Sequence, residues 1–464
     1  MIRARTFGCA LVLLVTTACR EKPANSGNHP LPVPAAPSAL RAPRLAFDLA
    51  SDLANKVGPR VAGSEGDRAA VQWALAAFAS RGIEAHAEPV RARVWRRIAE
   101  SAELVAPSAR RLTVTALGWS APSLPGGVEA EVVEVASLAE AQKLAPGALA
   151  GKIVLYNGTT ERAKDGSGYG RAVGARGLGA RVAERAGAVA SLVRSVGTDT
   201  SDDTPHTGSQ RQDSANIPSL AISHPSADAL HALIEAGKHP RVKLMVDCED
   251  LGYGDSANVV ATVRGADRPE EIVLMGAHLD SWDLARGALD DGAGVGTVMA
   301  ALTELSGTAI SRSVRVVLFS AEETSLAGGK AYAVAHESEI ARHVLGVEID
   351  TGTSAAYETR ISVGPGLRDT HARALADLMG PLGAPFADGE GDGGADLSPL
   401  RAAGMPVLEL RQDMTTYFDI HHSKKDTADK LDAVALDQLV TQLASAVSYA
   451  ANTTAPFGRA VRVR

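Results

Sequence analysis

The 464-residue chain is poor in cysteine, which limits how covalent cross-links could support its fold. Of its three cysteines, Cys9 and Cys19 lie close to the N-terminus, so Cys248 is the single thiol in the rest of the chain. One thiol cannot build an internal disulfide framework. We therefore expect Cys248 to be a small core residue.

The chain also lacks a long run of lysine and arginine, and its net charge is only -7. Nucleic-acid-binding proteins concentrate basic residues on one face or along one helix, so we expect no nucleic-acid partner. Aromatic residues make up only 4% of the chain, whereas hydrophobic residues make up 45% and charged residues 22%. This composition excludes a chain that is disordered throughout and is typical of an alanine-rich globular protein with aliphatic cores.

No apolar run is long enough to cross a bilayer, which takes about 20 residues. A shorter apolar stretch, residues 7–15, follows Arg3 and Arg5 and leads through small residues to Cys19, which is the pattern of a secretory signal. The string LLVTTAC resembles the lipobox of bacterial lipoproteins, in which the cysteine is acylated. We expect residues 1–19 to be a signal peptide of this type, and the protein to be anchored through Cys19 in the bacterial cell envelope, on its periplasmic side or outer surface. Simple secretion is the alternative.

The length of the chain predicts one large domain and a smaller one. Residues 20–44 contain six prolines among small and polar residues, and we interpret them as a flexible linker. Short β-rich runs separated by polar loops predict an inserted domain over residues 126–250. The alternative is that these strands continue the main sheet. The flanking segments, 45–125 and 251–455, then form one discontinuous domain.

Strands and helices alternate in the second of these segments. The strand-like runs EIVLMGA, VRVVLFS and HVLGVEI are separated by helical patterns over residues 292–306 and 328–336, and an amphipathic helix over residues 432–450 closes the domain. This alternation predicts an α/β fold with a mixed, mostly parallel sheet flanked by helices. In such sheets the functional crevice lies beyond the carboxyl ends of the strands.

Acidic and imidazole side chains occur where these strands end. Two imidazoles and three carboxylates are a ligand set that suits zinc, and a spare carboxylate beside them can move a proton. The predicted ligands of a site for two metal ions are His278, Asp290, Glu323, Asp350 and His422. Glu322, next to one ligand, is the predicted base. The chain is therefore predicted to be a hydrolase.

Two aspartates near the first ligand have alternative interpretations. Asp280 is a candidate to orient His278, because a metal-bound imidazole usually donates its second ring N–H to a carboxylate. Asp290 could bridge two cations with one oxygen on each, which is the role we assign to it. It could instead cap the helix that follows.

The remaining ligand positions leave two choices open. Glu348 competes with Asp350, because both lie at the end of the same apolar run. Spacing alone also does not decide whether His421 or His422 reaches the metal. Asp426, four residues after His422, is a candidate to orient it.

Taken together, these motifs resemble the M28 family of co-catalytic metallopeptidases, and most closely its carboxypeptidase Q-like branch. The resemblance rests on AHLDSWD, GALDDGAG, AEE, an acid 27 residues after the second glutamate, and HHSKKDT, across residues 270–430. GPRVAGS is similar to the N-terminal segment of that family. GKIVLY, TPHTG, IPSLAIS and GADLSPL are similar to its protease-associated domain and a late catalytic loop. The resemblance implies a zinc-exopeptidase, aminopeptidase-like fold with a protease-associated insertion over residues 126–250.

The resemblance also implies a role for each site residue. It distributes the ligands over two zinc ions, with His278 and Asp350 on one, Glu323 and His422 on the other, and Asp290 bridging both. Glu322 is then the general base. The family spacing, in which the ligand histidine precedes an aspartate by four residues, favours His422. His421 stands where many relatives have a tyrosine, so we expect it to take the part of the oxyanion donor.

The implied activity is hydrolysis of dipeptides or short peptides by metal-activated water, in an exported exopeptidase that we expect to be a homodimer. A glutaminyl-cyclase-like acyltransferase with a single zinc is an alternative, but the complete five-ligand set argues against it. A non-catalytic, receptor-like relative is a second alternative, and the intact ligands and Glu322 argue against it. The sequence leaves open aminopeptidase, dipeptidase or carboxypeptidase specificity, the preferred side chains, and whether the native metal is zinc, cobalt or manganese.

The inserted domain carries no chemical group to which the sequence assigns a function. Its glycine-rich residues 165–179 lack the GxxxxGK[ST] pattern of a phosphate-binding loop, so no nucleotide site is predicted. We therefore expect the inserted domain to be a lid or a spacer.

Overall fold

The structure is a computed structural model, and it describes residues 40–211 and 215–461. The predicted signal peptide with its acylation site Cys19, and the predicted linker up to residue 39, lie outside the described residues. Within the described ranges, no helix combines the length and the apolar character needed to pass through a bilayer.

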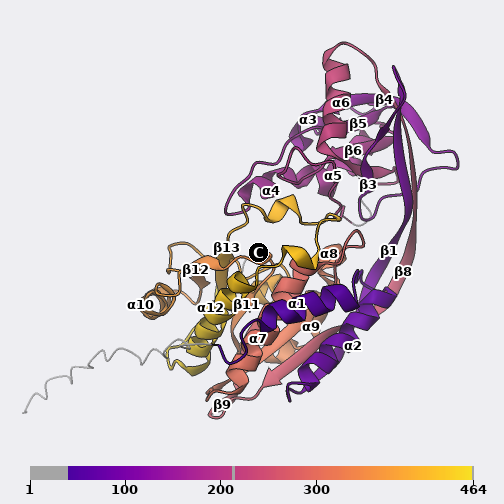
Figure 1. The fold of residues 1–464 in the computed structure, drawn as a ribbon. Helices are drawn as coiled ribbons and strands as arrows, with labels where there is room; N and C mark the ends of the chain where they lie inside the picture. Colours follow the sequence, from indigo (N-terminus) through magenta and orange to yellow (C-terminus); the bar gives the residue numbers. More distant parts are fainter. Residues whose placement is uncertain (1–39, 212–214, 462–464) are drawn as a thin grey trace, which may run out of the picture. The chain divides into compact units, whose positions relative to one another are not determined.

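Parallel strands form the middle of the main sheet (Figure 1). β9 (Arg268–His278) lies between β10 (Arg312–Phe319) and β11 (His343–Glu348), and β11 also pairs with β13 (Val407–Gln412). Antiparallel strands lie on either side, with β12 (Ala356–Ser362) next to β13 and β8 (Arg241–Val263) next to β10. The predicted mixed, mostly parallel sheet is confirmed.

Helices cover both faces of this sheet. Successive side chains of a strand point to opposite faces. Val273 and Met275 of β9 therefore pack into a large core with α1, α7 and α12, whereas Leu274 packs into a smaller core with α9 and α11. The helices of this part of the chain are α1 (Leu45–Lys56), α2 (Glu65–Ala79), α7 (Ala293–Ser306), α8 (Glu322–Ser325), α9 (Ala327–Ala335), α10 (Arg368–Met379), α11 (Ser398–Ala402) and α12 (Ala433–Asn452).

Side-chain caps explain where two of the helices begin. The Ser64 hydroxyl accepts a hydrogen bond from the Asp67 N–H at 3.1 Å, which starts α2. The Asp432 carboxylate likewise accepts from the first N–H groups of α12. These caps satisfy backbone donors that have no partner within the helix.

The inserted region, residues 107–240, adds a second set of strands. Its strands are β2 (Arg110–Leu112), β3 (Val114–Ala116), β4 (Val128–Val135), β5 (Ile153–Tyr156), β6 (Ala190–Arg194) and β7 (Ser219–Ile222). Its helices are α3 (Leu138–Ala141), α4 (Ser167–Ala172), α5 (Gly174–Arg185) and α6 (His224–Glu235). β8 joins this set to the main sheet, because its beginning pairs with β4 and its end with β10. The domain boundary at residue 250 stays a prediction, since β8 runs through it.

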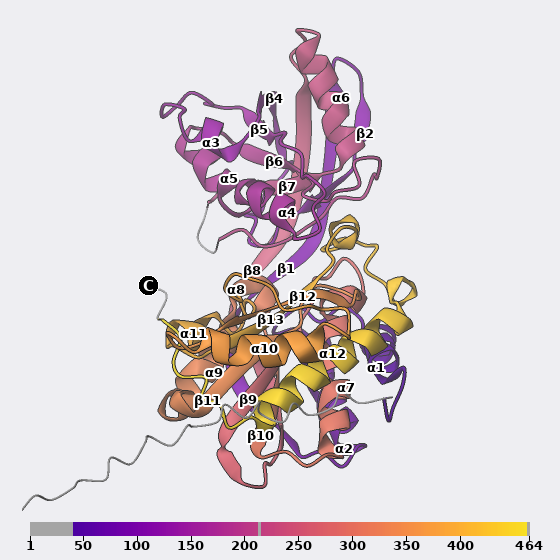
Figure 2. The same cartoon turned by 90° about the vertical axis from the view of Figure 1, so that its left-hand side faces the viewer.

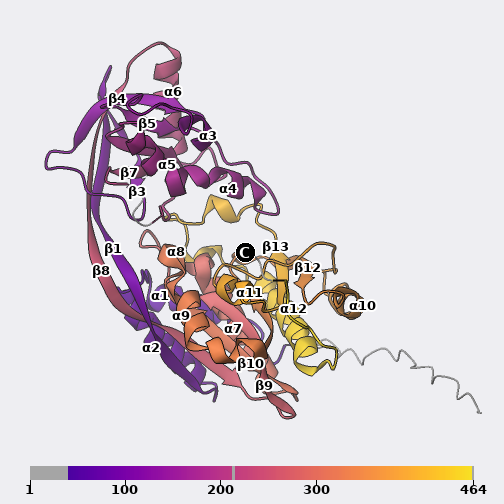
Figure 3. The same ribbon diagram turned by 180° about the vertical axis from the view of Figure 1, so that it is seen from behind.

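A long antiparallel ribbon connects the inserted region to the main sheet. β1 (Ala85–Ala106), which the sequence patterns do not predict, pairs with β8 from Ala85 opposite Ala261 to Ala106 opposite Arg241. The two strands run side by side (Figure 2, Figure 3). The inserted region therefore leaves and rejoins the main sheet on neighbouring strands.

Candidate metal centre

The predicted ligands come from five separate segments and meet at the carboxyl edge of the parallel strands. His278 is the last residue of β9, Glu323 belongs to the short helix α8 after β10, and Asp350 follows β11. Asp290 lies in the turn before α7, within residues Ala288–Gly292, and His422 lies in the loop after β13. The fold brings all five side chains together, as their contacts show.

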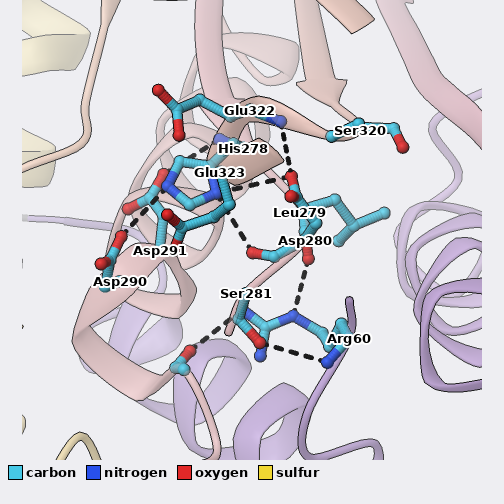
Figure 4. A network of polar contacts seen from close by, with 12 residues as sticks. Arg60, His278, Leu279, Asp280, Ser281, Asp290, Asp291, Ser320, Glu322 and Glu323 are labelled. Carbon is cyan, nitrogen blue, oxygen red and sulfur yellow. Dashed lines mark hydrogen bonds and ion pairs between the residues drawn. The ribbon is translucent and has the colours of Figure 1, made fainter. Parts of the chain in front are cut away.

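Asp290 faces one imidazole with each of its carboxylate oxygens. Its Oδ1 lies 3.1 Å from His278 Nε2, and its Oδ2 lies 3.3 Å from His422 Nε2 (Figure 4 shows the contact with His278). His278 Nε2 is also 3.2 Å from Asp350 Oδ1, and His422 Nε2 is 2.9 Å from Glu323 Oε2. The donors thus form two neighbouring groups that share Asp290.

The second ring nitrogen of each histidine lies against a backbone carbonyl. His278 Nδ1 lies 3.1 Å from the carbonyl oxygen of Asp280, and His422 Nδ1 lies 3.3 Å from that of Thr207. Because a carbonyl can only accept, His278 Nδ1 carries a proton. His422 Nδ1 lies 3.3 Å both from the Thr207 carbonyl oxygen and from Arg176 Nη1, which can only donate. Both Nε2 atoms face carboxylate oxygens, and a bound cation would take the place of a proton between them.

Unpartnered oxygen atoms also fit a metal site. Asp290 Oδ2 and Glu323 Oε1 are buried and have no hydrogen-bond partner, although buried polar groups are normally satisfied. Nitrogen and oxygen donors of this kind suit zinc. Within the described residues, three sets of donor atoms that lie within 4.8 Å of one another could hold a metal: Asp290, His421 and His422; His278, Asp290 and Glu323; and His278, Asp291 and Asp350.

The carboxylates strongly perturb one another because they are buried together. Burial and the charge of Asp290 raise the pKa of Glu323 well above its ordinary value. Burial alone would lower the pKa of His278, but Asp350 and Asp290 raise it well above the usual range. By contrast, burial and the neighbouring His421 hold the pKa of His422 well below its usual range, which keeps that imidazole neutral. A bound cation would relieve this accumulation of negative charge.

The sequence leaves open the choice between His421 and His422 and the choice between Glu348 and Asp350. The geometry distinguishes the members of each pair. His421 Nε2 lies 3.7 Å from Asp290 Oδ2, farther than His422, and its ring stacks on that of His422 with centroids 3.5 Å apart. The Glu348 carboxylate accepts hydrogen bonds from the backbone N–H groups of Asp396 at 3.4 Å and Leu397 at 3.2 Å, so it is turned away from the donor groups. The arrangement favours His422 and Asp350 as ligands.

Three aspartates position the ligands in ways that differ from the sequence-based expectation. The Asp280 carboxylate lies 3.7 Å from the His278 ring and instead accepts the Glu322 N–H at 3.0 Å, so its backbone carbonyl orients the imidazole. Asp426 does not contact His422 but accepts the backbone N–H of Asp290 at 3.2 Å. The capping role considered for Asp290 is taken by Asp291, which accepts the Gly294 N–H at 2.9 Å.

Arg60 ties together the loop between the first two ligands. It is fully buried, and its guanidinium donates to the carbonyl oxygens of Leu279 at 2.6 Å, Arg286 at 2.8 Å and Gly287 at 3.0 Å. Figure 4 shows it below the loop that follows His278. Its positive charge also lies near the carboxylates of the centre. GPRVAGS, the motif containing Arg60, is the sequence signal for this residue.

The donor groups open onto a cavity of about 280 Å³. Its wall contains Glu322, His421, Tyr417 and Phe418, together with Tyr169, Arg176 and Ser209 from the inserted region. The aromatic rings pack on His421, with centroid distances of 5.1 to 5.2 Å. The inserted region therefore contributes directly to the wall around the donor groups.

Arg176 is a candidate site residue that the sequence patterns do not single out. It is 8% exposed, its Nη2 donates to the Tyr169 hydroxyl at 2.7 Å, and its Nε has no hydrogen-bond partner. Its segment is rich in glycine, and the sequence predicts no phosphate-binding loop there. The one available signal is an arginine that lies on the buried side of the amphipathic pattern GARGLGARVAER.

Comparisons with known proteins match both parts of the chain. Residues 258–447 match peptidase family M28, and residues 126–230 match the PA domain. Carboxypeptidase Q from Mus musculus is 35% identical over 82% of this chain and 80% of its own length. Carboxypeptidase Q from Homo sapiens is 34% identical over 82% of this chain and 79% of its own length.

Solved structures give a consistent result. The crystal structure of a peptidase M28 precursor from Shewanella amazonensis SB2B is 40% identical, covers 90% of this chain and 95% of its own, and has a TM-score of 0.88. A zinc aminopeptidase from Bacillus subtilis, 21% identical, shares the fold with a TM-score of 0.63 over 89% of this chain and 97% of its own. The segment matched to family M28 contains all five predicted ligands and Glu322.

Replacing Arg60 by lysine tests the role of its guanidinium. Lysine keeps the charge but cannot reach three separate carbonyl groups, so buried acceptors lose their donors. We expect the free energy of unfolding to fall by about 2–4 kcal/mol, measured by urea denaturation. Arg68→Lys, at an exposed arginine of the same segment, is the control and should change stability by less than about 0.5 kcal/mol. Equal stability of the two variants would contradict the assigned role.

Proposed function

The chain belongs to peptidase family M28 and is a metallo-exopeptidase, and from this premise we propose that it hydrolyses dipeptides or short peptides at a centre for two zinc ions. The observation that carries the proposal is the position of Asp290, whose two oxygens face separate imidazoles. A single-zinc, glutaminyl-cyclase-like site would not need this second group of donors. A non-catalytic relative would not need Glu322 beside them.

The proposed ligand assignment follows the two groups of donors. His278 and Asp350 would hold one zinc ion, Glu323 and His422 would hold the other, and Asp290 would contribute to both. When bound, the ions would lower the pKa of a water molecule and stabilise negative charge on the oxygen of the scissile carbonyl group.

Glu322 is the proposed general base. Its side chain lines the cavity beside the donor groups, and its backbone N–H is held by the Asp280 carboxylate at 3.0 Å. Burial and the charges of Asp350 and Asp280 hold the pKa of Glu322 well above its ordinary value, although His278 lowers it. With cations bound beside it, Glu322 would be ionised, so it could take a proton from water and return it to the leaving amine.

His421 is the proposed donor to the oxygen of the attacked carbonyl group. Burial lowers its pKa to about 3, so the imidazole is neutral and keeps one N–H. Its ring is fixed by stacking on His422 and by the surrounding aromatic side chains. A donor that is held in place in this way needs little reorganisation during the reaction.

The cavity also indicates the substrate. A volume of about 280 Å³ has room for a short peptide, and the wall carries a buried guanidinium, Arg176, with an unpartnered Nε. An arginine in this environment pairs well with a carboxylate. We therefore propose that the preferred substrate is a dipeptide with a free C-terminal carboxylate.

Export and assembly are proposed from the sequence and the family resemblance. Residues 1–19 would direct the chain out of the cytoplasm, Cys19 would carry a lipid anchor, and the mature enzyme would be a homodimer. Mass spectrometry of the mature N-terminus tests the anchor. A lipid-modified Cys19 is expected, and an unmodified N-terminus at another residue would contradict it.

Replacing Glu322 by glutamine tests the proton transfer. Glutamine keeps the size of the side chain but cannot accept a proton, so kcat should fall by about 10²- to 10⁴-fold. The zinc content per chain, measured by elemental analysis, should stay that of the wild type because Glu322 is not a proposed ligand. Loss of zinc from this variant would show instead that Glu322 holds the metal.

Replacing Arg176 by methionine tests the substrate preference. The loss of a charge-assisted hydrogen bond should reduce kcat/KM for dipeptides with a free carboxylate by about 10- to 100-fold. Hydrolysis of the matching dipeptide amides should change much less, because these substrates have no carboxylate to bind. The zinc content serves as the control, since Arg176 also lies beside His422. An equal loss for both substrates would argue against carboxylate recognition.

A further inference from the structure

A loop of the inserted region lies against both segments that carry the proposed ligands of the second zinc ion. We call this loop, residues 204–210, the clasp. Its Thr207 N–H donates to the carbonyl of His422 at 2.9 Å, and His422 Nδ1 lies 3.3 Å from the carbonyl oxygen of Thr207. Its Ser209 hydroxyl donates to the carbonyl of Glu323 at 2.6 Å. The clasp therefore contacts one ligand through its ring and both through their backbone.

The clasp is itself firmly held. The Gly118 N–H donates to the carbonyl of Gly208 at 3.0 Å, and the Thr207 hydroxyl donates to the carbonyl of Ala116 at 2.9 Å. Arg97, on the ribbon strand β1, donates to the same hydroxyl at 3.0 Å. Thr207 is fully buried. These contacts fix the position from which the clasp reaches the ligands.

His422 has a backbone conformation that needs outside support. Its φ of 59° lies in the left-handed region, which residues with a side chain rarely adopt. Such a conformation persists when surrounding contacts determine it. The two hydrogen bonds with Thr207 hold the backbone and the ring of His422 at the same time.

Gly208 shows how closely the clasp approaches this ligand. A Cβ atom at this position would lie 2.7 Å from His422 Nδ1 and 2.5 Å from the guanidinium carbon of Arg176. Both distances are too short for a carbon atom to fit, and the φ of 131° also suits glycine. An added methyl group would therefore displace the ring that the clasp orients.

We propose that the clasp is a positioning part of the metal centre, which makes binding of the second zinc ion depend on the inserted region. The inference rests on the proposed function, since it assumes two ions. In the described part of the chain, the hydrogen bonds of the clasp reach Glu323 and His422 but neither His278 nor Asp350. The first ion should therefore bind independently of the clasp. This is a role different from the lid or spacer expected from the sequence.

Zinc binding by purified full-length variants tests the proposal. Ser209→Ala removes one hydrogen bond to a ligand segment without adding bulk, and Gly208→Ala introduces the methyl group. In both variants the first ion should bind as in the wild type, while the affinity for the second should fall by about 10- to 100-fold. Ser209→Thr, which keeps the hydroxyl donor, should behave as the wild type does. The measurement is zinc bound per chain after equilibration with a series of zinc buffers.

Gly177→Ala is the matched control for the added methyl group. A Cβ at Gly177, on α5 of the inserted region, meets no atom within 4 Å, so both ions should bind normally. Unchanged affinity for the second ion in Ser209→Ala and Gly208→Ala would overturn the proposal while leaving the proposed function intact. Parallel loss of both ions would also overturn it. A wild-type chain that binds only one ion would contradict the proposed function itself.

Discussion

The burial of several carboxylates close together in the candidate metal centre is the constraint on which the rest of the structure depends. Carboxylates are costly to remove from water unless a proton, a cation or hydrogen bonds compensate them. Burial and mutual repulsion raise the pKa of Glu322, Glu323 and Asp291 well above their ordinary values, so protons would collect here in the absence of a cation. A cation that takes the place of those protons favours the folded arrangement, because the unfolded chain does not assemble the same donors. Metal binding and local stability are therefore linked.

Main-chain groups provide most of the positioning around this charge. The Nδ1 atoms of His278 and His422 both lie against backbone carbonyls, and Arg60 donates to four more. Asp291 accepts the backbone N–H of His278 at 3.0 Å, and Asp426 accepts that of Asp290 at 3.2 Å. Ligands held through the backbone keep their direction when a neighbouring side chain changes. Such a centre is preorganised by its loops.

The difference between the ligand side chains and the backbone groups that orient them explains what the sequence could predict. The resemblance to family M28 and the fold class are confirmed. The ligand positions could be proposed because His278, Glu323 and Asp350 follow apolar strands, while Asp290 and His422 lie in motifs that resemble those of the family. The partners that orient them could not be predicted, since they depend on the path of the main chain. Asp280 thus contributes its carbonyl to His278, and Asp426 contacts the Asp290 turn. β1 escapes detection because its alternation is interrupted: its register with β8 shifts at three places, and Val94 and Trp95 are buried side by side.

The inserted region can take part in the site because of where it joins the sheet. β1 and β8 pair from Ala85 opposite Ala261 to Ala106 opposite Arg241, with three register shifts on the way, so the inserted residues leave and return on one antiparallel ladder. A ladder of this length is stiffer than two separate linkers, and it reduces the conformational freedom lost when the clasp meets His422. Arg97, which lies on this ladder, contacts both Thr207 of the clasp and Asp283 in the loop after His278. The strand that carries the insertion thus also contacts the loop that follows the proposed ligand His278.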